Sequence, residues 1–350
     1  RDNAGTVTTS DTQIKTGVYA LGEGSSKQAF TYSFLSALPD GDTADSNNFR
    51  AMSDAQKAGV RLAFDYLSSI INATFTESNS AGQADINFGT NNQSLINTSG
   101  YANPPNGSGD HAVYLMLDNS GRNPNTNFSA GSYGWQTLIH EIGHTLGFKH
   151  PGNYNATGGG SPGPYLPKAT DTRRYTVMSY NNPTDAVQVV HNTSAQGVTT
   201  FTPKYVYPQT YMSYDIAALQ YLYGVGDGAG VANYQVNEFS ADWSGMQTLW
   251  MPSEGSVDAS RTTRSNIIDL RAGAFSSINL TSLSDLNAIP TALRKQVTYM
   301  GLNNVGLAYG SEVTSAKGGA ANDTFFDAAT SGTVTIDAGA GANDLVYLAG

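Results

Sequence analysis

Apolar residues recur at a helical spacing in three stretches of the first 224 residues. The first stretch opens with a capping-box pattern at residues 53–56, and its apolar positions are Val60, Phe64, Leu67 and Ile71. A second helix is predicted from about residue 132 to 147. A third is predicted from the cap Ser213 to a stop at Gly224. Asp215 falls in the first turn of this third helix, where the helix dipole favours an acidic side chain.

Short runs between these helices are strongly apolar or alternate apolar and polar positions, which is typical of β-strands. They cover residues 30–35, 73–77, 85–89 and 111–117. The order of strand, helix, strands and helix predicts a mixed α/β lobe, in which one sheet packs against two helices.

The pattern changes after residue 224 to short β-like runs separated by Asn, Asp, Ser and Gly. The best linker is residues 224–230, GVGDGAG, and 350 residues exceed the usual size of a single core. We therefore predict three parts. They are an N-terminal extension or pro-segment remnant at 1–29, a mixed α/β domain at 30–224 and a β-rich domain at 225–350.

Two similar glycine-rich pieces stand near the end of the chain, 21 residues apart. GGAANDTFF at 318–326 and GAGANDLVY at 339–347 fit a degenerate form of the nonapeptide whose repeats bind Ca²⁺ in a parallel β-roll. Asp323 and Asp344 are the side chains expected to bind calcium. The alternative interpretation of each piece is an ordinary Asn-Asp turn between strands.

Composition excludes several classes of protein. The formal net charge is −10, and this acidic balance argues against nucleic-acid binding, which requires clusters of basic residues. No run of 18 apolar residues is present, which argues against a transmembrane helix. Cysteine is absent, so an extracellular form would depend on packing and bound ions for its stability. Charged residues make up only 13%, and the resulting polar but uncharged surface is typical of secreted β-rich proteins.

Three of the five histidines lie within the eleven residues HEIGHTLGFKH. On a helix, His140 and His144 share a face and can bind one metal ion. Glu141 can then reach a water molecule at that metal, and Gly147 can turn the chain so that His150 becomes a third ligand. Three imidazoles with an open coordination position indicate a catalytic zinc site, and the pattern is the metzincin signature. A buried histidine pair would not explain the glutamate and the third histidine.

Met178 follows His150 by 28 residues, where a Met-turn would pass beneath the metal. A single methionine is usually a core residue, but after this zinc signature the Met-turn interpretation is favoured. HEIGHTLGFKHPGNY together with YTVMSY resembles the serralysin family, the secreted bacterial metzincins with a calcium-binding C-terminal β-roll. Further segments that resemble serralysins lie at residues 31–34, 84–86, 215–224 and 267–278.

The resemblance implies an α+β metzincin catalytic domain, with a twisted mixed sheet and helices, followed by an all-β domain of β-roll or β-sandwich type. It implies that His140, His144 and His150 bind zinc and that Glu141 is the general base. Tyr180 matches the tyrosine that serralysins use as an additional, switchable zinc ligand. On substrate binding this tyrosine would swing away and donate a hydrogen bond to the oxyanion.

The chain departs from the serralysin pattern in its second half. The family's R-x-G-x-T calcium element is replaced by VGDGAGVANYQVNEF, and the glycine-rich repeats number two imperfect copies. We therefore expect fewer calcium ions than in a serralysin with an uninterrupted array. Further repeats or an export signal are expected beyond Gly350.

The predicted function is a secreted, extracellular bacterial zinc endopeptidase that cleaves proteins or peptides by metal-activated water. By analogy, an edge strand formed by Ser99, Gly100, Tyr101 and Ala102 would pair with an extended substrate. We expect a monomer, export independent of a signal peptide and a protein inhibitor as a further partner. Two alternatives stay open: a calcium-binding surface-layer or adhesin-type protein with a vestigial protease lobe, and a processing protease specific for one partner protein.

Overall fold

The computed structural model describes residues 27–38, 45–80, 82–94, 98–102, 113–120, 127–155, 158–160, 162–231, 235–328 and 333–348. Most of the predicted N-terminal extension lies outside these residues. The chain divides into two compact units: Arg1–Asn181 with Tyr214–Gly230, and Asn182–Ser213 with Val231–Gly350. The second division falls at the predicted linker, whereas residues 182–213 cluster with the second unit rather than with the predicted catalytic domain.

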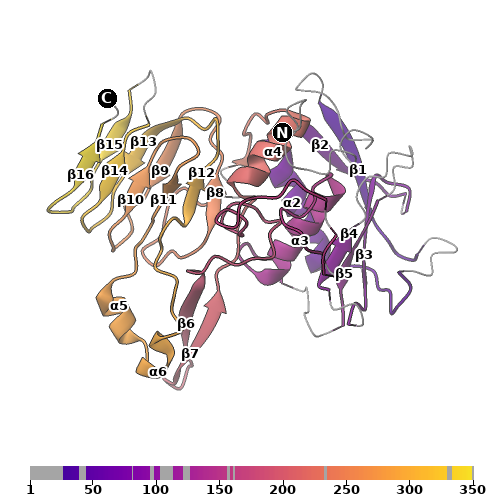
Figure 1. The fold of residues 1–350 in the computed structure, drawn as a ribbon, viewed down its shortest axis with the longest axis horizontal. Helices are drawn as coiled ribbons and strands as arrows, with labels where there is room; N and C mark the ends of the chain where they lie inside the picture. Colours follow the sequence, from indigo (N-terminus) through magenta and orange to yellow (C-terminus); the bar gives the residue numbers. More distant parts are fainter. Residues whose placement is uncertain are drawn as a thin grey trace. The chain divides into compact units, whose positions relative to one another are not determined.

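The first unit contains a five-stranded mixed sheet with the order β2-β1-β3-β5-β4 (Figure 1). The strands are β1 (Gln28–Phe34), β2 (Ala73–Glu77), β3 (Ile86–Asn91), β4 (Gly100–Ala102) and β5 (Val113–Asp118). The first four in spatial order run parallel, and β4 pairs antiparallel with β5 at the edge. The mixed sheet confirms the predicted α/β character of this lobe, and all four predicted strands are present.

Helix α2 (Asp54–Ile70) is the crossover that parallel β1 and β2 require. The predicted capping box is present, because Ser53 Oγ accepts from the Gln56 backbone N–H and the Gln56 side chain accepts from the Ser53 N–H. On the buried face, the Phe64 ring stacks on Phe75 of β2 at 4.4 Å between centroids. Burying each such side chain contributes about 1.5–3 kcal/mol, so the apolar stripe attaches the helix to the sheet.

Helices α3 (Tyr133–Thr145) and α4 (Ser213–Tyr223) end where glycine was expected to end them. Gly147 has a φ of 93° and Gly224 a φ of 80°, a region that costs glycine least. At its start, α3 is capped by Ser132, whose hydroxyl accepts from the Trp135 N–H at 3.1 Å. The local sequence therefore determines both ends of the helix that carries the histidines.

The second unit contains three small three-stranded sheets and the hairpin of β6 (Val187–Thr193) and β7 (Thr199–Tyr205). The sheets comprise β8 (Gln247–Leu249), β9 (Gly255–Asp258), β10 (Ile267–Asp269), β11 (Phe275–Ser276), β12 (Val305–Leu307), β13 (Val313–Lys317), β14 (Thr324–Phe326), β15 (Thr335–Asp337) and β16 (Leu345–Tyr347). Two short helices, α5 (Leu283–Ala288) and α6 (Thr291–Arg294), were not predicted. The buried core of this unit includes Phe239, Val257, Ile268 and Phe325.

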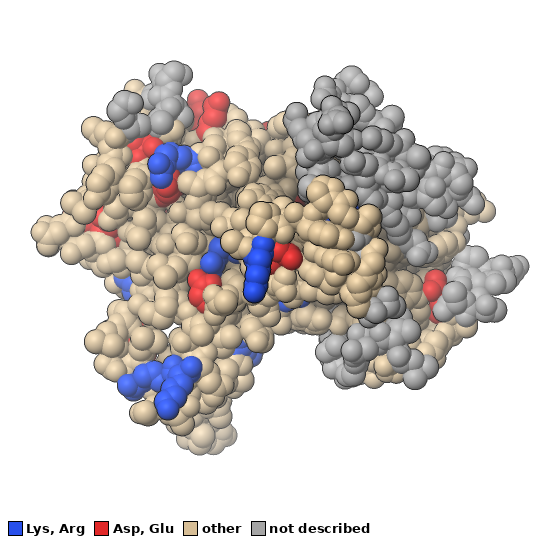
Figure 2. All heavy atoms as spheres, viewed as in Figure 1, with Lys and Arg blue, Asp and Glu red and all other residues tan. Residues whose placement is uncertain are grey.

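Charged groups are sparse among the described residues on the face shown in Figure 2. This agrees with the charged fraction of 13%. None of the helices in the described residues is long and apolar enough to cross a membrane.

An exposed ion pair joins α2 to the sheet and provides a pH test of the fold. Arg61 of α2 donates to both carboxylate oxygens of Glu77 on β2, at 2.7 and 2.9 Å. The hydrogen bond from Arg61 lowers the pKa of Glu77. A lowered pKa adds stability above the unfolded-state pKa, and this stability is lost as the pH falls through the folded-state value.

Glu77→Gln is therefore expected to lower the free energy of unfolding by at most about 1 kcal/mol at pH 7. As the pH falls to 3, the carboxyl group takes up a proton on passing its folded-state pKa, so the difference from wild type should narrow. Urea unfolding of both proteins at the two pH values measures this difference. High salt should also reduce it at pH 7, and an equal difference at both pH values would contradict the assignment.

Candidate metal centre and active site

The three motif histidines converge on one point. His140 and His144 lie on the same side of α3, and the turn at Gly147 returns the chain so that His150 faces them. The Nε2 atom of His150 lies 3.2 Å from that of His140 and 3.1 Å from that of His144. Within the described residues, this is the one group of at least three His, Cys, Asp or Glu side chains close enough to hold a metal ion.

The outer nitrogen of each imidazole is held by the backbone. His140 Nδ1 donates to the Val177 carbonyl at 2.8 Å, and His144 Nδ1 donates to the Phe148 carbonyl at 2.7 Å. The His150 ring is hydrogen bonded to the backbone of Tyr154. These bonds fix the tautomers, so that the lone pairs of the inner Nε2 atoms face one another.

Burial keeps the three rings neutral. It lowers the pKa of His140 well below the usual value and lowers the pKa of His150 to about 3. Two nitrogens bound tetrahedrally at 2.0–2.1 Å from a zinc ion lie about 3.3 Å apart, close to the distances observed. Neutral imidazoles, inward lone pairs and this spacing all fit zinc.

Glu141 is a buried carboxylate beside this group, with 6% of its surface exposed. Its Oε2 atom has no hydrogen-bond partner, and burial raises its pKa to about 8. Gly100 of β4 lies against it, since a Cβ atom there would approach Glu141 Cγ to 2.9 Å. Buried polar atoms are normally paired, so this oxygen is available to a water molecule or a substrate group.

Glu141 faces a cavity of about 350 Å³. Its lining residues are Thr98, Ser99, Gly100, Tyr133, Gln136, Thr137, His140, Glu141, Asn155, Arg173 and Tyr180. The predicted substrate strand therefore contributes Ser99 and Gly100 to the cavity. Tyr101 and Ala102 do not line it, and the Tyr101 hydroxyl instead bonds Asp45 and Asn91. The cavity therefore lies at the start of β4, a position that the sequence pattern alone did not reveal.

Met178 lies against α3 at the metal-binding turn and is 2% exposed. A Cβ atom at Gly143 would lie 2.6 Å from Met178 Sδ, so glycine at that position allows the close approach. Tyr180 is 41% exposed and its ring lies beside His150, at 4.5 Å between centroids. Burial, and then the charge of Glu141, raises the pKa of Tyr180 to about 12.

Asp215 supports the site in a way that the sequence did not reveal. It occupies the first turn of α4, as expected, but its carboxylate accepts from Thr176 Oγ1 at 2.6 Å and from the Val177 N–H at 2.8 Å. Because the Val177 carbonyl accepts from His140, Asp215 is linked to a metal-binding ring through one residue. The available signal was an acidic residue at the start of the mostly apolar segment DIAALQYLYG.

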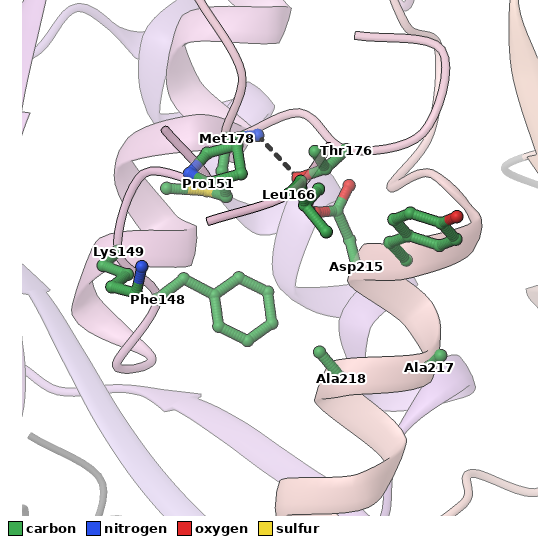
Figure 3. A pocket seen from close by; sticks show the side chains of 10 residues that line it. Phe148, Lys149, Pro151, Leu166, Thr176, Met178, Asp215, Ala217 and Ala218 are labelled. Atoms are coloured by element: carbon green, nitrogen blue, oxygen red, sulfur yellow. Dashed lines mark hydrogen bonds between the residues drawn. The ribbon is translucent and has the colours of Figure 1, made fainter. Parts of the chain in front are cut away.

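A second, apolar pocket of about 220 Å³ lies in the first unit between the third-histidine loop and α4. Figure 3 shows Met178, Pro151 and Leu166 on one side of it and Ala217 and Ala218 on the other. Met178 lines this pocket, and none of the three histidines does.

The two aspartates predicted to bind calcium lie in successive turns of the second unit. Asp323 Oδ1 accepts from the backbone and side-chain N–H groups of Asn266, and its Oδ2 accepts from the Gly319 N–H at 2.6 Å. Asp344 Oδ1 accepts from the Asp323 N–H at 2.7 Å. The carboxylates therefore form a ladder between neighbouring turns, and their calcium roles stay predictions.

Comparisons with known proteins agree with this site. The model of metallo-peptidase family M12 matches residues 24–190. Metallopeptidase AprA of Pseudomonas marginalis is 31% identical over 319 residues, which are 86% of this chain and 60% of that protein. A serralysin of Proteus mirabilis is 31% identical over 305 residues, which are 79% of this chain and 58% of that protein. The chain thus spans about 60% of the length of these curated relatives.

The fold of the first unit and its three-histidine group define the class of protein as a metzincin. The similarity to the AprA peptidases and serralysins makes this chain a serralysin-like metzincin, which confirms the resemblance found in the sequence.

Proposed function

We propose that the protein is a secreted zinc endopeptidase that hydrolyses peptide bonds of proteins. The observation that carries this proposal is the buried Glu141 carboxylate, which has an unpaired oxygen beside three neutral, converging imidazoles. A purely structural metal site has no use for such a group, because an unpaired buried carboxylate destabilises the fold. The names of the relatives, metallopeptidase and serralysin, support the same activity.

Each group of the site has a role in the proposed reaction. Zinc held by His140, His144 and His150 would polarise the scissile carbonyl and lower the pKa of a water molecule. Glu141 accepts the proton of the attacking water and then donates it to the leaving amine. The Tyr180 hydroxyl donates a hydrogen bond to the oxyanion that develops on the former carbonyl oxygen.

The edge strand β4 is proposed to bind the substrate backbone. One edge of β4 pairs with β5, and β4 is the last strand in the order of this five-stranded sheet. An extended peptide can add to such an edge as a further strand. Gly100 would then hold the scissile bond near Glu141, against which it lies.

We infer a β-roll with calcium in the second unit. The two glycine-rich pieces form β14 and β16, which pair in parallel with Phe325 opposite Val346. A side chain at Gly318 would collide with the Ala338 carbonyl oxygen and the Asp323 carboxylate, so oxygen atoms crowd these turns. Calcium binds six to eight such oxygens, and serralysins also bind calcium. Extracellular location, export without a signal peptide, a monomeric state and a protein inhibitor as partner are inferred from the serralysin family.

Chelation tests the proposed function. Casein cleavage is expected to be lost when 1,10-phenanthroline removes zinc and to return when zinc is added, because the imidazoles bind the ion that polarises the substrate. Metal analysis of the purified protein should find one zinc per chain and count the calcium ions. Cleavage that persists in metal-free protein would refute the proposal. Absence of cleavage by the zinc-loaded protein would favour the surface-layer alternative, and cleavage of a single site in a peptide library would favour the processing protease.

A further inference from the structure

The ring of Tyr154 packs beside both the third histidine and Tyr180, whose own rings are 4.5 Å apart between centroids. Its centroid is 5.6 Å from that of His150 and 4.9 Å from that of Tyr180, with the two tyrosine rings inclined by only 28°. Tyr154 does not line the 350 Å³ cavity, so it is not placed to touch a substrate there. Its ring instead packs against Tyr180, which lines the cavity, and against the metal-binding ring of His150.

The hydroxyl group of Tyr154 anchors this ring. It donates to Asp171 Oδ1 at 2.6 Å, and the Ser179 hydroxyl donates to the same oxygen at 2.7 Å. The Tyr180 backbone N–H donates to the Tyr154 hydroxyl at 3.4 Å. Asp171 is 8% exposed and Ser179 is fully buried, so the carboxylate oxygen that accepts both hydroxyl groups is shielded from solvent. The hydroxyl therefore links the third-histidine loop to the turn that carries Met178 and Tyr180.

The backbone of Tyr154 makes a separate connection to the metal site, because it accepts the hydrogen bond from the His150 ring. Gly152 makes the arrangement possible, since a side chain there would collide with the Tyr154 ring and with the Asp171 carboxylate. One residue thus holds the outer nitrogen of a metal-binding ring with its backbone and the Tyr180 segment with its side chain.

We propose that Tyr154, anchored by Asp171, is a positioning residue that holds His150 and Tyr180 in one mutual arrangement. This inference rests on the proposed function only for the roles of those two residues. Groups that orient a metal-binding histidine typically change metal affinity or activity 10–100-fold when they are removed. Small displacements of reacting groups have effects of similar size on rate.

The test uses four variants of the full chain. Tyr154→Phe keeps the ring and removes the hydroxyl, and Asp171→Ala removes the anchor. Asp171→Asn keeps an acceptor oxygen in the place of Oδ1 for the hydroxyls of Tyr154 and Ser179. This conservative variant should therefore restore the properties that Asp171→Ala loses. Tyr165→Phe is the matched control, because it removes the hydroxyl of an exposed ring in the same loop. Each variant is loaded with Co²⁺, whose visible absorption reports the geometry of its ligands, and kcat and KM are measured on the zinc-loaded form.

We expect Tyr154→Phe and Asp171→Ala to shift the cobalt spectrum and to lower kcat about 10-fold, with KM changed less than about twofold. Asp171→Asn and Tyr165→Phe should resemble wild type. A lower melting temperature with an unchanged spectrum and kcat in Tyr154→Phe would show a merely structural role and overturn the proposal. If Tyr154→Phe does not fold, the proposal is tested by comparing the cobalt spectrum and kcat of Asp171→Ala with those of Asp171→Asn. If wild type lacks peptidase activity, the proposed function fails, while the cobalt spectra still test the positioning role.

Discussion

Glu141→Gln is expected to abolish peptide-bond hydrolysis while the fold and the zinc content stay unchanged. Glutamine has nearly the same shape as glutamate but cannot accept the proton of the attacking water. General acid–base catalysis contributes about 10²–10⁴-fold to rate, so kcat should fall about 10³-fold. Glu141→Ala should have the same effect and also leave the carboxylate's place beside Gly100 empty.

The measurement combines kcat on a fluorogenic peptide with zinc analysis and circular dichroism of the same preparations. Glu238→Gln is the matched control, because it makes the same chemical change on an exposed side chain and should keep full activity. Zinc retained at one per chain together with lost activity assigns Glu141 to catalysis rather than to metal binding. Wild-type activity in Glu141→Gln would remove the residue from the proposed mechanism.

The parts of this protein that could be predicted from the sequence are those whose causes are local. The spacing of His140 and His144 and the turn at Gly147 follow from helix geometry alone, and the structure shows both. The capping box of α2 depends on residues three apart. Such features need no information about the rest of the chain.

Features that depend on distant pairing were not predictable in the same way. The sheet order β2-β1-β3-β5-β4 and the antiparallel edge strand follow from which strands meet, which periodicity does not report. The strand β4 spans three residues, so no pattern could show that Ser99 and Gly100 line the cavity while the Tyr101 hydroxyl bonds Asp45. The placement of residues 182–213 in the second unit likewise depends on long-range contacts, such as the Thr298 and Tyr299 N–H groups donating to Val187.

Removing the Asp215 carboxylate has the second large expected effect, because this carboxylate is connected to the same site through Thr176 and Val177. Asp215 is 2% exposed and accepts from Thr176 and Val177, which are themselves buried. In Asp215→Ala both donors lose their acceptor inside the protein. Each unsatisfied buried group costs about 1–3 kcal/mol, so the free energy of unfolding of the first unit should fall by about 3 kcal/mol.

Removal of the Asp215 carboxylate should also weaken zinc binding, because the Val177 carbonyl orients His140. The zinc dissociation constant is expected to rise about 10-fold or more, in the range found for groups that orient metal-binding histidines. Asp215→Asn keeps one acceptor oxygen and should fall between the alanine variant and wild type. The exposed Asp65→Ala on α2 is the control, with a change within about 0.5 kcal/mol.

Urea unfolding of the metal-free protein and zinc competition with a chelator separate the two effects of Asp215→Ala. Unfolding must be followed by two probes, since two units can unfold in separate steps. A stability loss with unchanged zinc affinity would mean that Asp215 supports the fold alone. If both quantities change while Asp65→Ala leaves both at wild-type values, then α4, which begins more than 60 residues after His150, determines how tightly the motif binds its metal. The zinc signature is then necessary for the site but depends on a carboxylate that lies outside it.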